Sequence, residues 1–296
     1  MLIERLAIIG VGLIGGSLAL ALRHKKACKH VIGYGRDTAR LEKAVQLGVI
    51  DEFSLTVASA VKQADVVVLA TPLATTGPLL KSMCNYLGEE TIITDVGSVK
   101  GSVVSAARTA LGELFPRFVP GHPIAGKEQS GVEAADRDLF VAHRVILTPL
   151  PETSVRALER VTDMWETVDA DVVSLAVEQH DEILAATSHL PHMLAYALVD
   201  CLAGLQERDE IFRFAAGGFA DFTRIASSNP QMWHDICFSN RGQLLNALEI
   251  FNRYLDDIRK AIETDDSDTL LKIFTRAKNT RDRFCDNRKK PGRDPE

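Results

Sequence analysis

The six residues GVGLIG, at positions 10–15, follow an apolar run at residues 6–9 and open a helical pattern. Their spacing, Gly-x-Gly-x-x-Gly between a strand and a helix, is typical of a dinucleotide-binding turn. In such a turn Gly10 permits the tight bend, Gly12 admits a diphosphate, and Gly15 lets the helix approach the strand. The first turn of the helix adds unpaired N–H groups and the positive end of its dipole. The stretch therefore predicts that the chain binds a dinucleotide.

The choice between NAD and NADP is usually made about twenty positions past the third glycine. An acid there binds the ribose hydroxyls, whereas an arginine accommodates a 2′-phosphate. This chain has Gly35 at that position, followed by Arg36. The missing acid favours NADP, although the nearby Asp37 keeps NAD open, and Arg36 could instead simply cap a solvated turn. The residues expected to bind the cofactor are Gly10, Gly12, Leu13, Ile14, Gly15, Arg36 and Thr71.

Short runs rich in valine and isoleucine alternate with helical patterns through the first 175 residues. The runs lie at 6–9, 31–34, 66–70, 91–95, 118–121, 145–148 and 172–175. Continuous apolar runs of this length are typical of strands that are buried on both faces. A helix is expected over 38–47, with Asp37 as its N-cap and Gly48 just past its end. The alternation predicts an α/β fold with a Rossmann-like, doubly wound parallel sheet.

Beyond residue 175 the strand signal ends and the chain is predicted to be all-helical. The stretches 177–205 and 230–262 carry apolar residues at helical spacing. The segment 183–205 is apolar almost all round, so we expect it to be buried, against a second subunit. We expect a dinucleotide-binding domain at 1–173, a helical domain at 174–286, and a disordered tail at 287–296, which is charged and lacks apolar periodicity.

Composition restricts the class of protein and of partner. The chain has 296 residues, 46% of them hydrophobic, and no run of 18 apolar residues, so we expect no membrane span. A net charge of −6 and 6% aromatic residues argue against nucleic-acid binding and favour a small-molecule substrate. Five cysteines without a CxxC pair, and an N-terminus without a leader pattern, predict reduced thiols and a cytoplasmic protein.

Two polar clusters follow predicted strands, where a parallel sheet places catalytic groups. In the first, Ser98 is expected to cap the following helix, and its hydroxyl could also reach a substrate oxygen. In the second, His122 lies between Gly121 and Pro123 at the end of the run 118–121. Most histidines are structural, but this position at a strand's carboxyl end favours acid–base catalysis.

A third cluster lies in the helical half, at 188–192 and 217–224. His180, Asp181, His189 and His192 could form a metal site for hydrolysis, but no carboxylate or cysteine partner has matching spacing, and no metal is expected. Arg224 lies in an otherwise apolar segment, where an unpaired guanidinium would be costly to bury. It therefore either pairs with a neighbouring acid or binds an anionic ligand.

Taken together, these motifs resemble those of the prephenate/arogenate dehydrogenase (cyclohexadienyl dehydrogenase) family of tyrosine biosynthesis. The resemblance runs from about residue 6 to residue 284. It rests on GVGLIGGS at 10–17, TDVGSVKG at 94–101, GHPIAGKEQSGVE at 121–133, SHLPH at 188–192 and GGFADFTRIA at 217–226. Only the first motif is widespread among dehydrogenases, so the specificity comes from the other four in this order.

The resemblance implies an oxidative decarboxylation of prephenate or arogenate, with hydride transfer to NADP or NAD. It implies that His122 is the base for the ring hydroxyl, that Ser98 orients this hydroxyl, and that Arg224 holds a substrate carboxylate. It also implies that His192 lies near the side-chain end of the substrate. Glu128, Gly217 and Trp233 are weaker candidates for the substrate pocket. The helical half would be a homodimerisation domain. We also expect neither an ACT domain nor a fused chorismate mutase.

Two alternatives stay open at this point. A 3-hydroxyacid or 6-phosphogluconate type dehydrogenase also joins a Rossmann domain to a helical domain and uses a lysine near an asparagine, of which Lys278-Asn279 is a possible equivalent. A non-catalytic redox sensor would bind the dinucleotide without needing His122, Ser98 and Arg224 together.

Overall fold

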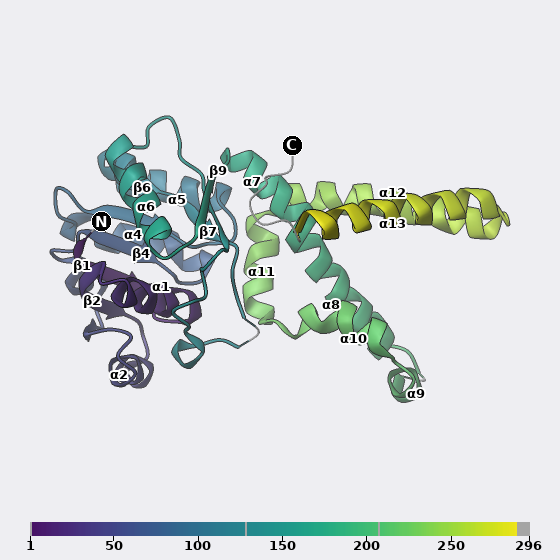
Figure 1. Cartoon of the computed structure of the whole chain (residues 1–296), viewed down its shortest axis with the longest axis horizontal. Helices are drawn as coiled ribbons and strands as arrows, with labels where there is room; N and C mark the ends of the chain where they lie inside the picture. Colours follow the sequence, from purple (N-terminus) through teal and green to yellow (C-terminus); the bar gives the residue numbers. More distant parts are fainter. Residues whose placement is uncertain (1, 128, 207, 289–296) are drawn as a thin grey trace. The chain divides into compact units, whose positions relative to one another are not determined.

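The computed structural model describes residues 2–127, 129–206 and 208–288. The chain divides into two compact units, Met1–Leu244 and Leu245–Glu296. Unit 1 contains all the described strands and the helices from α1 through α11, which ends at Ser239 (Figure 1).

A six-stranded parallel sheet forms the centre of unit 1. In spatial order its strands are β3 (Glu52–Ser54), β2 (Cys28–Tyr34), β1 (Ile3–Ile9), β4 (Val66–Leu69), β5 (Ile92–Asp95) and β6 (Phe118–Val119). Leu6 of β1 is level with Val31 on one side and Val66 on the other. The winding direction changes between β1 and β4, which is where open α/β sheets bind their ligands. The predicted Rossmann-like sheet is confirmed.

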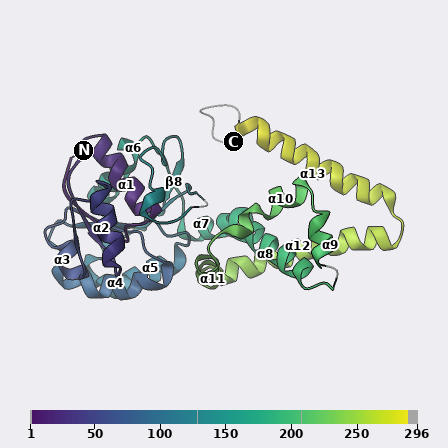
Figure 2. The same ribbon diagram turned by 90° about the horizontal axis from the view of Figure 1, so that it is seen from below.

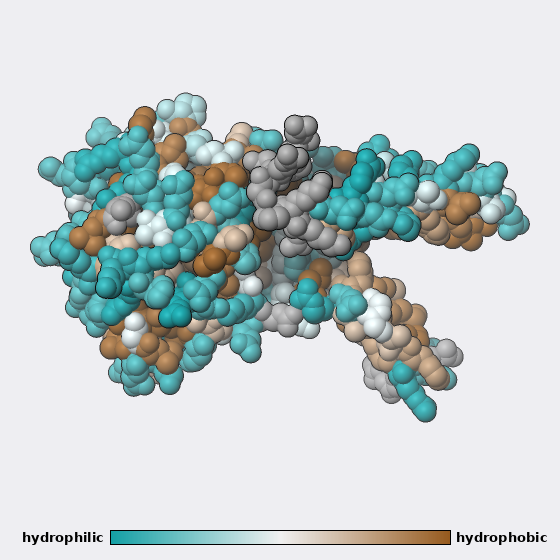
Figure 3. All heavy atoms as spheres, viewed as in Figure 1, coloured by the Kyte–Doolittle hydropathy of each residue, from teal (hydrophilic) through white to brown (hydrophobic). Residues whose placement is uncertain are grey.

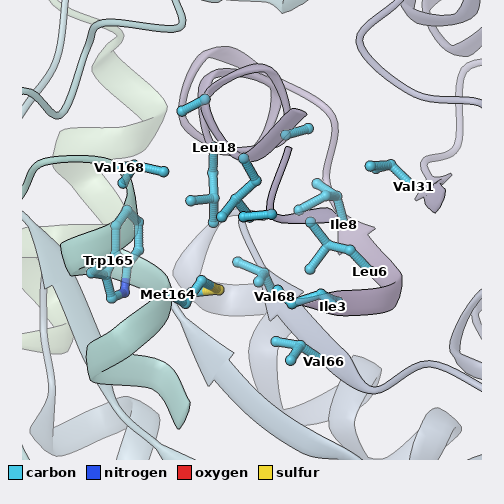
Figure 4. Packing of buried hydrophobic residues seen from close by; sticks show 14 of the residues in the cluster. Ile3, Leu6, Ile8, Leu18, Val31, Val66, Val68, Met164, Trp165 and Val168 are labelled. Carbon is cyan, nitrogen blue, oxygen red and sulfur yellow. The ribbon is translucent and has the colours of Figure 1, made fainter. Parts of the chain in front are cut away.

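Helices cover both faces of this sheet. One face is covered by α1 (Leu13–His24), α2 (Thr38–Gln46) and α6 (Val155–Thr167). The other is covered by α3 (Val57–Val61), α4 (Thr76–Met83) and α5 (Gly101–Leu111), which lie side by side in Figure 2. Figure 4 shows Leu18 of α1 and Trp165 of α6 on the same side as Ile8 and Val68. Because side chains alternate along a strand, Ala7 belongs to the core on the opposite face.

The seven apolar runs were expected to form one parallel sheet, and this expectation is wrong for the strands after β6. β7 (Gly121–Pro123), β8 (Arg144–Leu147) and β9 (Asp171–Ser174) form a separate three-stranded sheet, in which β7 and β8 are antiparallel. The predicted strand at 118–121 is divided at Pro120, which has no N–H to continue the ladder of β6. The prediction also missed β3, a three-residue edge strand that is too short to show a pattern.

The helical half of unit 1 begins directly after β9. The segment expected to be helical at 177–205 consists of α7 (Val177–Leu184), a π-helical turn η5 (Ala185–His189) and α8 (Leu190–Ala203). α8 packs against α10 (Gly217–Thr223) and the 3-10 turn η6 (Arg224–Ser227). The remaining helices are α9 (Arg208–Arg213) and α11 (Pro230–Ser239), and shorter turns are η1 (Leu73–Thr75), η2 (Cys84–Tyr86), η3 (Gly112–Arg117) and η4 (Val132–Ala134).

The single chain does not bury the segment 183–205 as expected. Leu190 and Ala195 are buried, but Ile183 and Leu205 remain 39% and 46% exposed. Contacts within the chain use only part of this apolar surface. The predicted burial of the remaining part still depends on a second subunit.

Unit 2 contains most of α12 (Arg241–Glu263) and all of α13 (Ser267–Arg288). Figure 3 shows hydrophobic surface on these helices. Its exposed large apolar residues are Leu245, Ile250, Tyr254, Leu255, Ile262, Leu271, Phe274 and Phe284. The disordered tail was expected to start at residue 287, but α13 continues through Arg288. Residues 289–296 lie outside the described residues. Within the described ranges, no helix is both long and apolar enough for a bilayer.

Candidate functional site

The glycine turn after β1 has open space at one of its three glycines. At the other two there is no space for a side chain. Gly10 has φ of +103°, and a Cβ there would lie 2.5 Å from the Ala70 carbonyl oxygen. A Cβ on Gly15 would lie 2.5 Å from the Gly10 oxygen, so α1 can approach the strand only with glycine there. At Gly12 a Cβ would have no neighbour within 4 Å. The turn is therefore closed by Gly10 and Gly15 and open at Gly12.

The other expected cofactor residues lie around this turn. Leu13 and Ile14 begin α1. Thr71 follows β4, and its methyl group would lie 2.8 Å from a Cβ on Gly10. Its hydroxyl accepts a hydrogen bond from Thr75 at 2.9 Å. These residues are brought to one edge of the sheet, beside the point where the winding direction changes.

Past the end of β2, Arg36 is exposed and Asp37 has its carboxylate engaged elsewhere. Asp37 caps α2, as predicted, by accepting from the Arg40 backbone N–H at 3.2 Å. The same carboxylate forms an ion pair with the Arg40 guanidinium at 3.3 Å. Asp37 is thus committed to the first turn of α2.

His122, on β7, is one end of a chain of three side chains. Its Nδ1 lies 2.9 Å from Nε2 of His180, whose own Nδ1 lies 2.7 Å from Oδ1 of Asp181. His122 is 9% exposed and His180 is completely buried. Among the described residues, the Nε2 atom of His122 has no hydrogen-bond partner. The reactive side of the His122 ring is therefore available to a ligand.

Asp181 joins this chain to the start of α5. Its two oxygens accept the backbone N–H groups of Lys100 and Gly101, each at 2.8 Å. Burial opposes ionisation of Asp181, but the hydrogen bonds from His180, Lys100 and Gly101 outweigh it, and its pKa is lowered. The prediction that Ser98 caps α5 is wrong, because α5 begins later and Asp181 supplies the cap from α7. Ser98 lies half-buried in the preceding loop.

A buried ion pair holds the backbone next to His122. The Lys100 ammonium donates to Oδ2 of Asp95 at 2.5 Å and to the Gly121 carbonyl oxygen at 2.6 Å. Asp95 in turn accepts from the Gly121 N–H at 3.2 Å. Lys100 and Asp95 lie in the motif TDVGSVKG, but the sequence reasoning missed their role. An aspartate at the end of an apolar strand and a lysine five positions later were the available signal.

The surroundings of His122 keep its imidazole neutral. Burial lowers its pKa most, and repulsion from His180, Lys100 and His189, when these carry a positive charge, lowers it further, well below the usual value. A neutral imidazole can accept a proton near neutral pH. The site thus holds an uncharged base on β7, just past the end of β6.

His192 and Trp233 stack on the helical side, with ring centroids 3.7 Å apart and planes 21° apart. The Nδ1 of His192 donates to the Ser188 carbonyl oxygen at 2.8 Å. Burial lowers the His192 pKa, the Ser188 hydrogen bond opposes this, and the charge of Arg224 lowers it further. Arg224, at the start of η6, is therefore close enough to influence His192.

His189 and Trp233 leave two buried donors without partners among the described residues. The Asn240 amide donates to Nδ1 of His189 at 3.2 Å, which places the hydrogen of the neutral ring on Nε2. That Nε2 and the Trp233 indole nitrogen are the unpaired atoms. Burial lowers the pKa of His189 to about 4, against the opposing charge of Asp181. A buried donor without an acceptor is costly, and a ligand oxygen could satisfy it.

Two further pocket residues were expected from the sequence, Gly217 and Glu128. Gly217 is exposed at the start of α10, and Glu128 lies outside the described residues. No metal-binding group of three ligands occurs in the described part of the chain, and both ring nitrogens of His180 are already hydrogen-bonded. Lys278, the residue behind one alternative, is exposed on α13 and pairs with Asp282.

Comparison with known proteins covers both halves of the chain. The family described as "Prephenate dehydrogenase, nucleotide-binding domain" matches residues 18–174, and "Prephenate dehydrogenase, dimerization domain" matches 176–276. The chain is 38% identical to the prephenate dehydrogenase of Bacillus subtilis, over 94% of this chain and 76% of the relative. It is 37% identical to the cyclohexadienyl dehydrogenase of Zymomonas mobilis, over 94% and 95% of the two chains.

Solved structures show the same likeness. Prephenate dehydrogenase from A. aeolicus, in complex with hydroxyphenyl propionate and NAD+, superposes with a TM-score of 0.90 and 36% identity, covering 96% of this chain and 99% of that one. Synechocystis arogenate dehydrogenase superposes with a TM-score of 0.81 and 28% identity, covering 95% and 100%. The likeness includes both the α/β part and the helical part.

Proposed function

The chain belongs to the prephenate dehydrogenase family, and from this premise we propose which of its residues carry the reaction and which cofactor it prefers. It is a nicotinamide-dependent oxidoreductase of tyrosine biosynthesis. The reaction is the oxidative decarboxylation of prephenate and/or arogenate to 4-hydroxyphenylpyruvate and/or tyrosine.

The residues of the glycine turn fit a dinucleotide. The open space at Gly12 admits a diphosphate, and the first N–H groups of α1 face such an anion favourably. Gly10, Leu13, Ile14, Gly15 and Thr71 complete this part of the site. A nicotinamide held there would supply the hydride acceptor for the substrate carbon that bears the hydroxyl.

His122 is the base in this proposal. Its Nε2 takes the proton of the substrate hydroxyl as the carbon loses hydride, and the ring carboxylate leaves as carbon dioxide. Aromatisation of the ring supplies driving force, so the protein mainly has to position the alcohol and accept its proton. The observation that carries the assignment is a neutral imidazole at the sheet edge, with Nε2 free of described partners and Nδ1 anchored.

The substrate's other groups are assigned to residues around His122. Ser98 orients the hydroxyl, and Arg224 binds a substrate carboxylate, for which the guanidinium geometry is suited. His192 and Trp233 lie at the side-chain end of the substrate, where the unpaired indole N–H offers a donor. The resemblance alone supports the weaker candidates, Glu128 and Gly217.

NADP is the preferred cofactor in this proposal. Three observations support the preference: Gly35 has no carboxylate, Arg36 is exposed beside it, and Asp37 is occupied by Arg40. A carboxylate already engaged in a helix cap and an ion pair is poorly placed to bind ribose hydroxyls. The exposed guanidinium offers a partner for a 2′-phosphate.

The assembly in this proposal is a homodimer formed by the helical domain, with the boundary between the domains at residues 173 and 174. Support comes from the matching dimerization domain and from the apolar residues that stay exposed on α12, on α13 and at either side of α8, at Ile183 and Leu205. A second copy would cover surface that one chain leaves in water.

Replacing His122 with asparagine tests the assignment of the base. We expect His122→Asn to lower kcat by about 10²- to 10⁴-fold, which is the usual contribution of a general base. The Kd for NADP should change less than about twofold, because the turn lies elsewhere. Reduced cofactor is followed by absorbance, with each substrate and each nicotinamide.

The matched control is His143→Asn, which changes an exposed histidine of the same domain. It should leave kcat unchanged. An unchanged kcat in His122→Asn would remove this residue from the mechanism. A wild-type protein that binds NADP without turning over either substrate would favour the sensor alternative.

A further inference from the structure

His180 is a completely buried histidine that lies between His122 and Asp181. Both of its ring nitrogens are used, one toward each neighbour. The proposed function assigns it no role, although it is the only described residue that hydrogen-bonds the His122 ring. A buried side chain with this connectivity can control the protonation of its neighbour.

The direction of these hydrogen bonds follows from Asp181. Its carboxylate accepts from the Lys100 and Gly101 N–H groups and lies at the N-terminus of α5, where a negative charge is stabilised. An ionised carboxylate only accepts, so Nδ1 of His180 must donate to it. A neutral His180 then presents a lone pair at Nε2.

The lone pair of His180 determines the tautomer of His122. With a lone pair facing it, Nδ1 of His122 must carry the hydrogen and donate across the 2.9 Å contact. The neutral His122 ring then has its lone pair at Nε2, on the side left for a ligand. The opposite tautomer would set two lone pairs or two hydrogens against each other.

The charges around the pair also decide where a proton is better held. The Lys100 ammonium, before α5, opposes a positive charge on His122, and so does His189 on η5 when it is protonated. His180 faces Asp181, whose oxygen lies 2.7 Å from its Nδ1. An imidazolium at His180 is therefore paired with a carboxylate, whereas one at His122 is not.

We infer that His180 is a positioning residue that fixes His122 with Nε2 as the acceptor and takes the Nδ1 proton of His122 during turnover. As the substrate O–H bond breaks, an N–H bond forms at Nε2 of His122. The N–H bond at Nδ1 of His122 breaks in turn, and one forms at Nε2 of His180. One proton enters the pair, so the positive charge lies on His180 beside Asp181 until the proton returns by the same path to the phenolate oxygen that decarboxylation leaves. The turnover step rests on the proposed function.

Two substitutions separate the two parts of this inference. In His180→Gln the amide oxygen can still accept from His122, but the amide cannot hold an extra proton. In His180→Leu neither is possible. We expect kcat to fall at least about tenfold in the glutamine variant and about 10²- to 10³-fold in the leucine variant, with KM within about twofold in both.

The tautomer of His122 is read directly from ¹⁵N NMR of the free, histidine-labelled protein at pH 7.5. In the wild type and in His180→Gln the hydrogen should lie on Nδ1, and in His180→Leu this preference should be lost. The matched control, His143→Gln, should change neither the His122 signal nor kcat. Thermal unfolding of each variant shows that the fold is retained.

Wild-type kcat in His180→Gln would overturn the proton transfer, and an Nε2–H tautomer of His122 in the wild type would overturn the positioning role. The NMR measurement needs no substrate. It would therefore stand if neither prephenate nor arogenate were oxidised, and that failure would concern the proposed function alone.

Discussion

Arg36, just past the end of β2, is the side chain on which the expected cofactor preference depends most. Arg36 is exposed there, next to a glycine in the position where NAD-binding turns carry an acid. The nearest acid, Asp37, serves α2 by capping it and pairing with Arg40. The cofactor preference therefore depends on which charged side chain is left to bind the adenosine ribose and its 2′-phosphate.

Replacing Arg36 with alanine should weaken NADP binding selectively. A hydrogen bond to a charged group contributes about 1.5–3 kcal/mol, so KM for NADP should rise about 10- to 100-fold. KM for NAD, which lacks the 2′-phosphate, should change less than about threefold. Steady-state kinetics with both cofactors measure the ratio. Lys43→Ala removes another exposed positive charge from the same region and should leave the ratio unchanged.

At the scale of elements, the site depends on contacts between segments that are far apart in the chain. Asp181 of α7 caps α5, and Lys100 ties the end of β5 to the start of β7. These two contacts set the position of His122 from both sides. They also commit two charged residues, Lys100 and Asp95, to the protein interior.

Replacing Lys100 with methionine should therefore destabilise the protein. Removing one partner leaves the Asp95 charge buried without its counter-ion, which typically costs about 3–5 kcal/mol. Urea unfolding measures the loss. The double variant Asp95→Asn/Lys100→Met removes both charges and should recover part of the stability. If the single and double variants lost the same amount, the ion pair would not be the cause.

Stability should also fall as the pH falls below 6.5. The folded protein holds His189 and His122 neutral at pH values where the unfolded chain protonates them, because both native pKa values are lowered. The unfolded state then binds more protons, so the free energy of unfolding decreases with decreasing pH. With a native pKa of about 4, His189 alone should account for about 2 kcal/mol between pH 7.5 and pH 5.

Urea unfolding at pH 7.5, 6 and 5 measures this slope. His189→Gln cannot titrate and should flatten the slope, whereas His143→Gln should not. A wild-type stability that stays constant down to pH 5 would contradict the assignment of neutral, buried histidines.

At the scale of the whole molecule, the expected homodimer gives the exposed apolar residues of unit 2 a role. Phe274 on α13 is 54% exposed and lies one helical turn from Leu271, which is 65% exposed. Burying one such side chain contributes about 1.5–3 kcal/mol, and a symmetric interface contains it twice.

Phe274→Glu should therefore raise the dimer dissociation constant at least about 100-fold. Sedimentation velocity over a range of protein concentrations measures it. The control Lys272→Glu changes an exposed residue on the opposite side of α13 and should have little effect. A wild-type protein that remains monomeric at all concentrations would contradict the proposed assembly.

Local patterns were sufficient to predict the α/β sheet, the glycine turn, the helical half and the family resemblance. Each depends on residues a few positions apart: the glycine spacing at 10–15, the apolar runs, and motifs such as SHLPH. Such patterns act through backbone conformation and burial, which neighbouring residues largely determine. The same patterns placed His122 at the end of the strand 118–121, whereas it is the middle residue of β7, which follows β6 in a second sheet.

Only the tertiary structure decided how the charged residues are connected. Asp181 replaces the expected Ser98 as the cap of α5 across about eighty positions, and Pro120 sends β7 into a second sheet. His180 and Asp181, considered from sequence as metal ligands, instead form hydrogen bonds with His122 and α5. Hydrogen bonds and ion pairs depend on distance and direction in space, and sequence spacing gives neither for residues on separate elements.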